Sequence, residues 1–126
     1  MRIRVRGKTG RPAALALWEL FGSLIEAGIV QTNALGEECV WEAFKLGPWH
    51  LRVQLAGHPN SYSVDMEYFP GLWRVVCVFK PAGRLRVFEF EGAPNPARGN
   101  EPEVTRLPAP ELADSMLDLV LFSGED

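Results

Sequence analysis

Residues 62–90 decide the fold: YSVDMEYFPGLWRVVCVFKPAGRLRVFEF. Apolar and polar side chains alternate along its first part, Tyr62–Tyr68, and two turn sequences follow, FPGL at 69–72 and KPAGR at 80–84. Alternation with a period of two predicts strands that bury one face, and turns this short predict hairpins rather than helical crossovers. We therefore expect three consecutive antiparallel strands here.

The two turns also predict how these strands pair. A two-residue turn between the first two strands would place Tyr68 opposite Trp73, so that their apolar side chains share one buried face. A three-residue turn between the next two strands would place Val76 opposite Phe88 on the other side, the outer face of the sheet. Both registers follow from local turn chemistry alone.

Outward from this stretch, the pattern predicts the remaining elements. Residues 2–6 alternate as a strand does, residues 12–28 repeat apolar side chains at helical spacing, and residues 29–92 read as about five short strands. The connection at about 92–110 contains five prolines, and a second helix follows from Pro110. We expect one α+β domain spanning residues 1–126, with a mainly antiparallel sheet of five to six strands and the order β-α-β-β-β-β-β-α.

Composition and charge exclude several classes of protein. Hydrophobic residues make up 47% of the 126 residues, which is typical of a folded globular chain rather than a disordered one. A net charge of -3 provides no field that would hold a polyanion, so nucleic acid is not an expected partner. No apolar run approaches the length that spans a bilayer, so we expect a cytoplasmic protein with no membrane partner.

Few residues could support catalysis or bind a metal. The only histidines are His50 and His58, and the only cysteines, Cys39 and Cys77, form no CxxC pair and have no histidine nearby in sequence. We interpret both cysteines as buried thiols, although the sequence leaves a disulfide open. The pattern predicts no catalytic residue, no metal and no cofactor, and it favours a binding module over an enzyme.

The predicted outer face of the sheet is the most informative surface. It mixes apolar side chains with charged ones, and its expected members are Arg52, Asp65, Glu67, Arg74, Val76, Val78, Arg86, Phe88 and Phe90. Either a helix or the first strand covers this face, or it binds a partner, because apolar surface rimmed by charges is typical of protein interfaces. Our leading hypothesis is a non-enzymatic protein-binding module of small inhibitor, immunity or accessory type, which binds another protein or itself as a homodimer.

A second hypothesis comes from the order of the elements, which resembles that of helix-grip folds. The resemblance rests on topology, and no sequence motif accompanies it. It implies a curved sheet and a final helix that enclose an apolar pocket for a small ligand. The side chains expected to line that pocket are Trp49, Tyr62, Met66, Tyr68, Trp73 and Met116.

Overall fold

The chain forms two helices and six strands. The computed structural model describes residues 11–35, 40–57, 62–96 and 104–122. In chain order the elements are α2 (Arg11–Ala34), β1 (Trp41–Gly47), β2 (His50–Leu55), β3 (Ser63–Phe69), β4 (Arg74–Lys80), β5 (Arg84–Phe90), β6 (Val104–Leu107) and α3 (Ala109–Phe122). The α+β class and both helices agree with the sequence-based prediction.

The sheet is mixed rather than purely antiparallel. Its strands follow the chain order β1-β2-β3-β4-β5-β6, and the first five pair as antiparallel neighbours. β6 pairs with β5 in parallel, and it lies inside the proline-containing segment at about 92–110, which the sequence predicted to be a connection rather than a strand. The strand predicted at 2–6 lies outside the described residues, so the described order begins with a helix.

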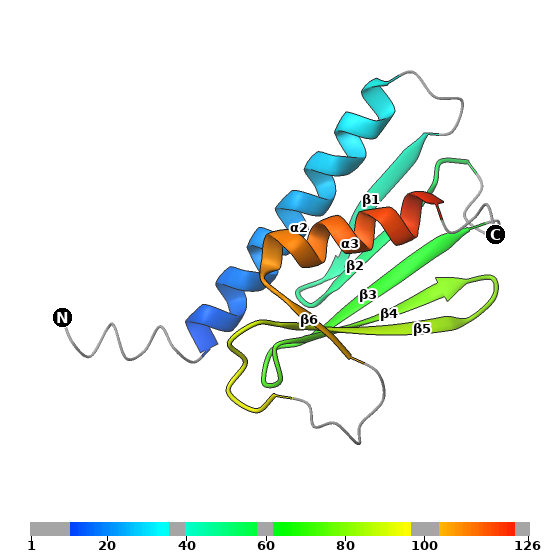
Figure 1. Cartoon of the computed structure of the whole chain (residues 1–126). Coiled ribbons are helices and arrows are strands. Elements are labelled where there is room, and N and C mark those ends of the chain that lie inside the picture. Colours follow the sequence, from blue (N-terminus) through cyan, green and yellow to red (C-terminus); the bar gives the residue numbers. More distant parts are fainter. Residues whose placement is uncertain (1–10, 36–39, 58–61, 97–103, 123–126) are drawn as a thin grey trace.

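Both helices pack on one side of the sheet (Figure 1). Their buried side chains, such as Phe21 and Ile25 of α2 and Leu112 and Met116 of α3, join the apolar strand residues in one core. The helices also contact each other, at Gly28, where an added Cβ would lie 2.4 Å from Leu117. This two-layer arrangement leaves the opposite side of the sheet without a helix from the described part of the chain.

α2 is longer than the sequence predicted. We expected Gly28 to end the helix, but the helix continues for six more residues, to Ala34. Gly28 has a different role, because the absence of a side chain there permits the close approach of α3. The extension carries Asn33 to the edge of β1. There its side-chain amide donates to the carbonyl of Trp41 and its side-chain oxygen accepts from the Trp41 N–H, both at 2.9 Å. A helix side chain thus satisfies the backbone N–H and C=O of one residue of this edge strand.

The β3–β4 hairpin has a longer loop than predicted. Phe69 pairs with Arg74, so four residues form the loop, and Tyr68 faces Val75 instead of Trp73. The reason is Trp73, which adopts a left-handed φ of 56° and buries its indole, while its carbonyl accepts from the Phe90 N–H. The loop is two residues longer than predicted. Because side chains alternate with a period of two, this even difference leaves the apolar side chains of both strands on the core face.

The β4–β5 hairpin overturns the predicted outer face. Gly83 has a φ of 77° and donates its N–H to the Phe79 carbonyl, so the loop holds four residues and Phe79 pairs with Arg84. This register differs from the predicted one by one residue, which reverses every side chain of β5. Phe88 and Phe90, expected outside, are 2% and 0% exposed in the core.

Tyr68 is the centre of an aromatic cluster that joins α2 to the sheet. Its ring stacks on Trp18 at a centroid distance of 5.0 Å, and Trp49 and Phe90 contact it at 5.7 Å each. Its hydroxyl donates to the carbonyl of Ala14 at 2.8 Å in a buried position. Burial raises the pKa of Tyr68 far above its usual value, so the hydroxyl keeps its proton and its hydrogen bond.

We expect Tyr68→Phe to lower the free energy of unfolding by about 1–2 kcal/mol, because it removes the donor to a buried carbonyl and preserves the ring. Urea denaturation followed by circular dichroism measures this change. Tyr62→Phe is the matched control: Tyr62 is only partly buried and donates to the Leu119 carbonyl at 3.3 Å, so its loss should be smaller. Equal losses in both variants would contradict the central role of Tyr68.

Candidate functional site: the open face of the sheet

The side of the sheet opposite both helices, called the open face below, contains most of the predicted interface. The strand registers place six predicted residues there: Arg52, Asp65, Glu67, Arg74, Val76 and Val78. Phe88 and Phe90 are absent from it because they lie in the core, and Arg86 pairs with Cys77 on the core side of the sheet.

The residues that β5 contributes to the open face are instead Leu85, Val87 and Glu89. The sequence contained one signal for them. In the predicted register Arg74 faces Phe90, whereas a shift of one residue brings Arg74 opposite Glu89 and forms a cross-strand pair of opposite charges. That pairing favours the register that the structure has.

An apolar band crosses the middle of the open face. Val76 pairs with Val87 and Val78 pairs with Leu85, so four apolar side chains lie next to one another on β4 and β5. Leu85 is 63% exposed, and the three valines are partly exposed. A single valine facing water is ordinary in a strand, but two adjacent apolar pairs form a continuous surface that water solvates poorly.

On one side of the band lies the Asp65 cluster. Asp65 Oδ1 accepts hydrogen bonds from His50 Nε2 at 2.8 Å and from Arg52 Nε at 2.9 Å. Lys80 Nζ lies 3.3 Å from Oδ2, so the two groups form an ion pair but not a hydrogen bond. Burial favours the neutral carboxyl, but these cationic and hydrogen-bonding partners outweigh it and hold the pKa of Asp65 below its usual value.

At the other end of β4 and β5 lies the Glu89 cluster. The Glu89 side chain is fully buried although it belongs to the open face, and Arg74 Nε donates to its Oε2 at 2.9 Å. Arg106 of β6 donates to Oε1 from the other side. Because one carboxylate between two guanidiniums connects three strands, this cluster holds the short parallel strand β6 to the sheet.

The geometry of these clusters suits ion pairing better than proton transfer. A carboxylate with a lowered pKa that already accepts two hydrogen bonds is a weak base. His50 uses Nε2 as a donor, because an ionised carboxylate accepts only. Within the described ranges, no group of three His, Cys, Asp or Glu side chains could hold a metal ion. The clusters therefore present fixed charge beside the apolar band.

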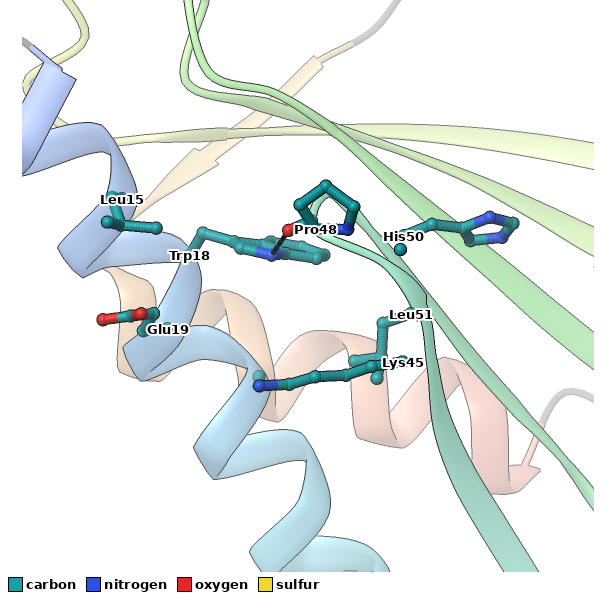
Figure 2. A pocket seen from close by; sticks show the side chains of 9 residues that line it. Leu15, Trp18, Glu19, Lys45, Pro48, His50 and Leu51 are labelled. Atoms are coloured by element: carbon teal, nitrogen blue, oxygen red, sulfur yellow. Dashed lines mark hydrogen bonds between the residues drawn. The ribbon is translucent and has the colours of Figure 1, made fainter.

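The pocket expected beneath the C-terminal helix has a different position. Met66, Tyr68 and Met116 are fully or almost fully buried in the core, so they fill the interior under α3 rather than line a cavity there. The structure does contain a pocket of about 240 Å³, between α2 and the turn that connects β1 to β2 (Figure 2). We call it the α2 pocket.

The remaining candidate residues contribute little to the site. Cys77 is a buried free thiol, and burial raises its pKa well above the usual value, so it is unreactive. Cys39 and His58 lie outside the described residues, and because Cys77 is a free thiol, the disulfide that the sequence left open does not form. Cys77 lies on the core face of β4, away from the open face.

α2 is more apolar than the sequence analysis allowed. Its segment Ala13–Ala34 has 22 residues with a mean hydropathy of 1.6, and about a third of it is buried in the fold. By length and composition alone this helix of the described chain could cross a membrane, contrary to the expectation that no run approaches that length. Core helices of soluble proteins have the same character, so the helix does not establish where the protein resides.

Comparison with known proteins adds no relative: no family model, curated protein or solved structure matches this chain. The function must therefore be argued from the chemistry of the surfaces themselves.

Asp65→Asn should reduce stability at neutral pH by about 1 kcal/mol, because Arg52 and Lys80 lose their anion at a partly exposed site. The folded-state pKa of Asp65 is lowered, so its contribution is present above the unfolded pKa of about 4 and disappears as the pH falls through the folded value. Urea unfolding of wild type and variant at pH 7 and pH 3 measures this. Glu67→Gln, at an exposed neighbouring position, is the control and should change stability by less than about 0.5 kcal/mol.

Proposed function

We propose that this chain is a non-enzymatic protein-binding module, of small inhibitor, immunity or accessory type, and that the open face of its sheet is the binding surface. The observation that carries this proposal is the apolar band formed by the pairs Val76–Val87 and Val78–Leu85, which no helix or strand among the described residues covers. The partner is another protein or a second copy of this chain.

The surroundings of the band support a protein partner. Interfaces combine an apolar centre with a polar rim, and here the Asp65 cluster and the Glu89 cluster flank the apolar pairs on two sides. Both carboxylates are already paired within the chain, so a partner need not neutralise a buried charge when it binds. Strands also form a stiff platform, which reduces the entropy lost on association.

The proposal is tested with a double variant, Val76→Lys with Leu85→Lys. Two ammonium groups in the middle of the band should weaken association at least about tenfold, because the partner would have to bury them. Folding should persist, with a stability change of about 1 kcal/mol or less, since both side chains reach solvent. Replacing Phe88 would not test the proposal, because its side chain belongs to the core.

Val30→Lys is the matched control: Val30 is 67% exposed on α2, far from the open face. Sedimentation velocity measures self-association, and quantitative capture from the native cell measures binding of other proteins, with the wild type and both variants compared side by side. A dimer or a captured protein that only the double variant loses supports the proposal. An assembly that the double variant retains, or no association of the wild type in either assay, overturns it.

A further inference from the structure

The α2 pocket lies on a different part of the molecule from the open face band. Trp18 of α2 forms one wall, and its indole N–H donates to the Pro48 carbonyl at 3.0 Å, which ties the helix to the β1–β2 turn. Leu15 of α2 lies beside the indole, and the Lys45 side chain extends from β1 toward α2 (Figure 2). The pocket thus has an apolar wall of leucine, tryptophan and proline.

The lining of the pocket includes a glycine, Gly22, that the fold itself does not require. Gly22 is buried in the middle of α2, where glycine costs about 0.5–1 kcal/mol relative to alanine. An added Cβ at Gly22 would meet no atom within 4 Å beyond its chain neighbours and the helix backbone. Gly28 of the same helix is different, because a Cβ there would collide with Leu117. Close packing explains Gly28, whereas Gly22 keeps a space open.

Two opposite charges accompany this space. Glu19 of α2 and Lys45 of β1 both line the pocket; the Lys45 side chain reaches toward α2, whereas Glu19 points outward from the helix (Figure 2). In the part of the chain that the structure describes, neither side chain forms an ion pair with the other or with a third residue. A carboxylate and an ammonium beside an apolar cavity complement a ligand that carries both charges and an apolar body.

The volume limits the size of that ligand. At about 240 Å³, the pocket is smaller than the roughly 300–1,000 Å³ typical of sites for drug-sized ligands. It therefore suits a small ligand, such as a branched aliphatic amino acid.

We propose that the α2 pocket binds a free aliphatic α-amino acid of the size of leucine. Its side chain packs against Trp18 and Leu15 above Gly22, its ammonium group pairs with Glu19 and its carboxylate pairs with Lys45. The pocket shares His50 with the Asp65 cluster but no residue with the apolar band, so it stands whether or not the band binds a protein.

The test is a titration of the ¹⁵N-labelled full chain with L-leucine, followed by the amide signals of Gly22 and Gly47 and the indole N–H signal of Trp18. Gly47 also lines the pocket. These signals should shift in a saturable way, with a Kd of about 1 mM or below for a ligand of this size. Isoamylamine and 4-methylpentanoate, which lack the carboxylate and the ammonium respectively, should each bind about two- to fivefold more weakly.

Gly22→Leu fills the cavity and should weaken leucine binding at least about tenfold. Its matched control is Ser23→Leu, which adds the same side chain on the exposed side of α2 and should bind leucine as the wild type does. Glu19→Gln and Lys45→Met test the charges without filling the space, so the proposal can still fail if Gly22→Leu does not fold. Each should weaken binding about two- to fivefold.

Three results would overturn the proposal: no saturable shift with leucine at about 20 mM, well above the expected Kd; undiminished binding by a folded Gly22→Leu chain; or equal affinity for N-acetyl-leucinamide, which has neither charge. None of these results depends on the open face, because every substitution lies in or beside α2 and β1.

Discussion

The stacking of Trp18 on Tyr68 is the contact on which the arrangement of the molecule depends. The two rings lie almost parallel, and the Tyr68 hydroxyl adds a buried hydrogen bond to the backbone of α2. The contact fixes the first half of the helix over β3, while Gly28 allows α3 to lie against the second half. Both helices are therefore held on the same side of one sheet, and they share its core.

Because both helices pack on one side of the sheet, the chemical character of the other side is set by the strand side chains alone. A sheet with two faces and helices on only one of them leaves strand side chains directed outward, and those of β4 and β5 are apolar in pairs. The charged neighbours of these pairs are ordered by the Asp65 and Glu89 clusters. The open face is therefore a fixed surface of mixed character, and the functional proposal follows from this property rather than from any catalytic arrangement.

The two ends of α2 make different contacts with the sheet. Near its end, the side chain of Asn33 pairs with the backbone of the edge strand β1. Nearer its beginning, Trp18 forms a hydrogen bond with the β1–β2 turn, and a Cβ added at Gly22 would meet open space. The α2 pocket lies beside the Trp18 contact, where Gly22 leaves space next to the β1–β2 turn, and a pattern of apolar residues along one segment does not reveal it.

The sequence by itself determined the α+β class, the two helices, the five strands of the antiparallel meander, and the sorting of apolar side chains within β3 and β4. These are local properties, because the period of the side chains follows from the backbone geometry of each segment. It also identified six of the residues on the open face correctly. The apolar positions of β5, the parallel strand β6 and the length of α2 were decided by the tertiary structure.

The physical reason lies in how registers are set. One residue more or less in a turn reverses every side chain that follows, and the difference between a three-residue and a four-residue loop at Gly83 depends on distant contacts. Phe90 gains its place against Tyr68 and Phe21, and Glu89 gains two arginines, only when the loop has four residues. These contacts lie outside the turn, so local turn chemistry could not choose between the two registers, and the Arg74–Glu89 pair was the one signal in the sequence that favoured the observed one.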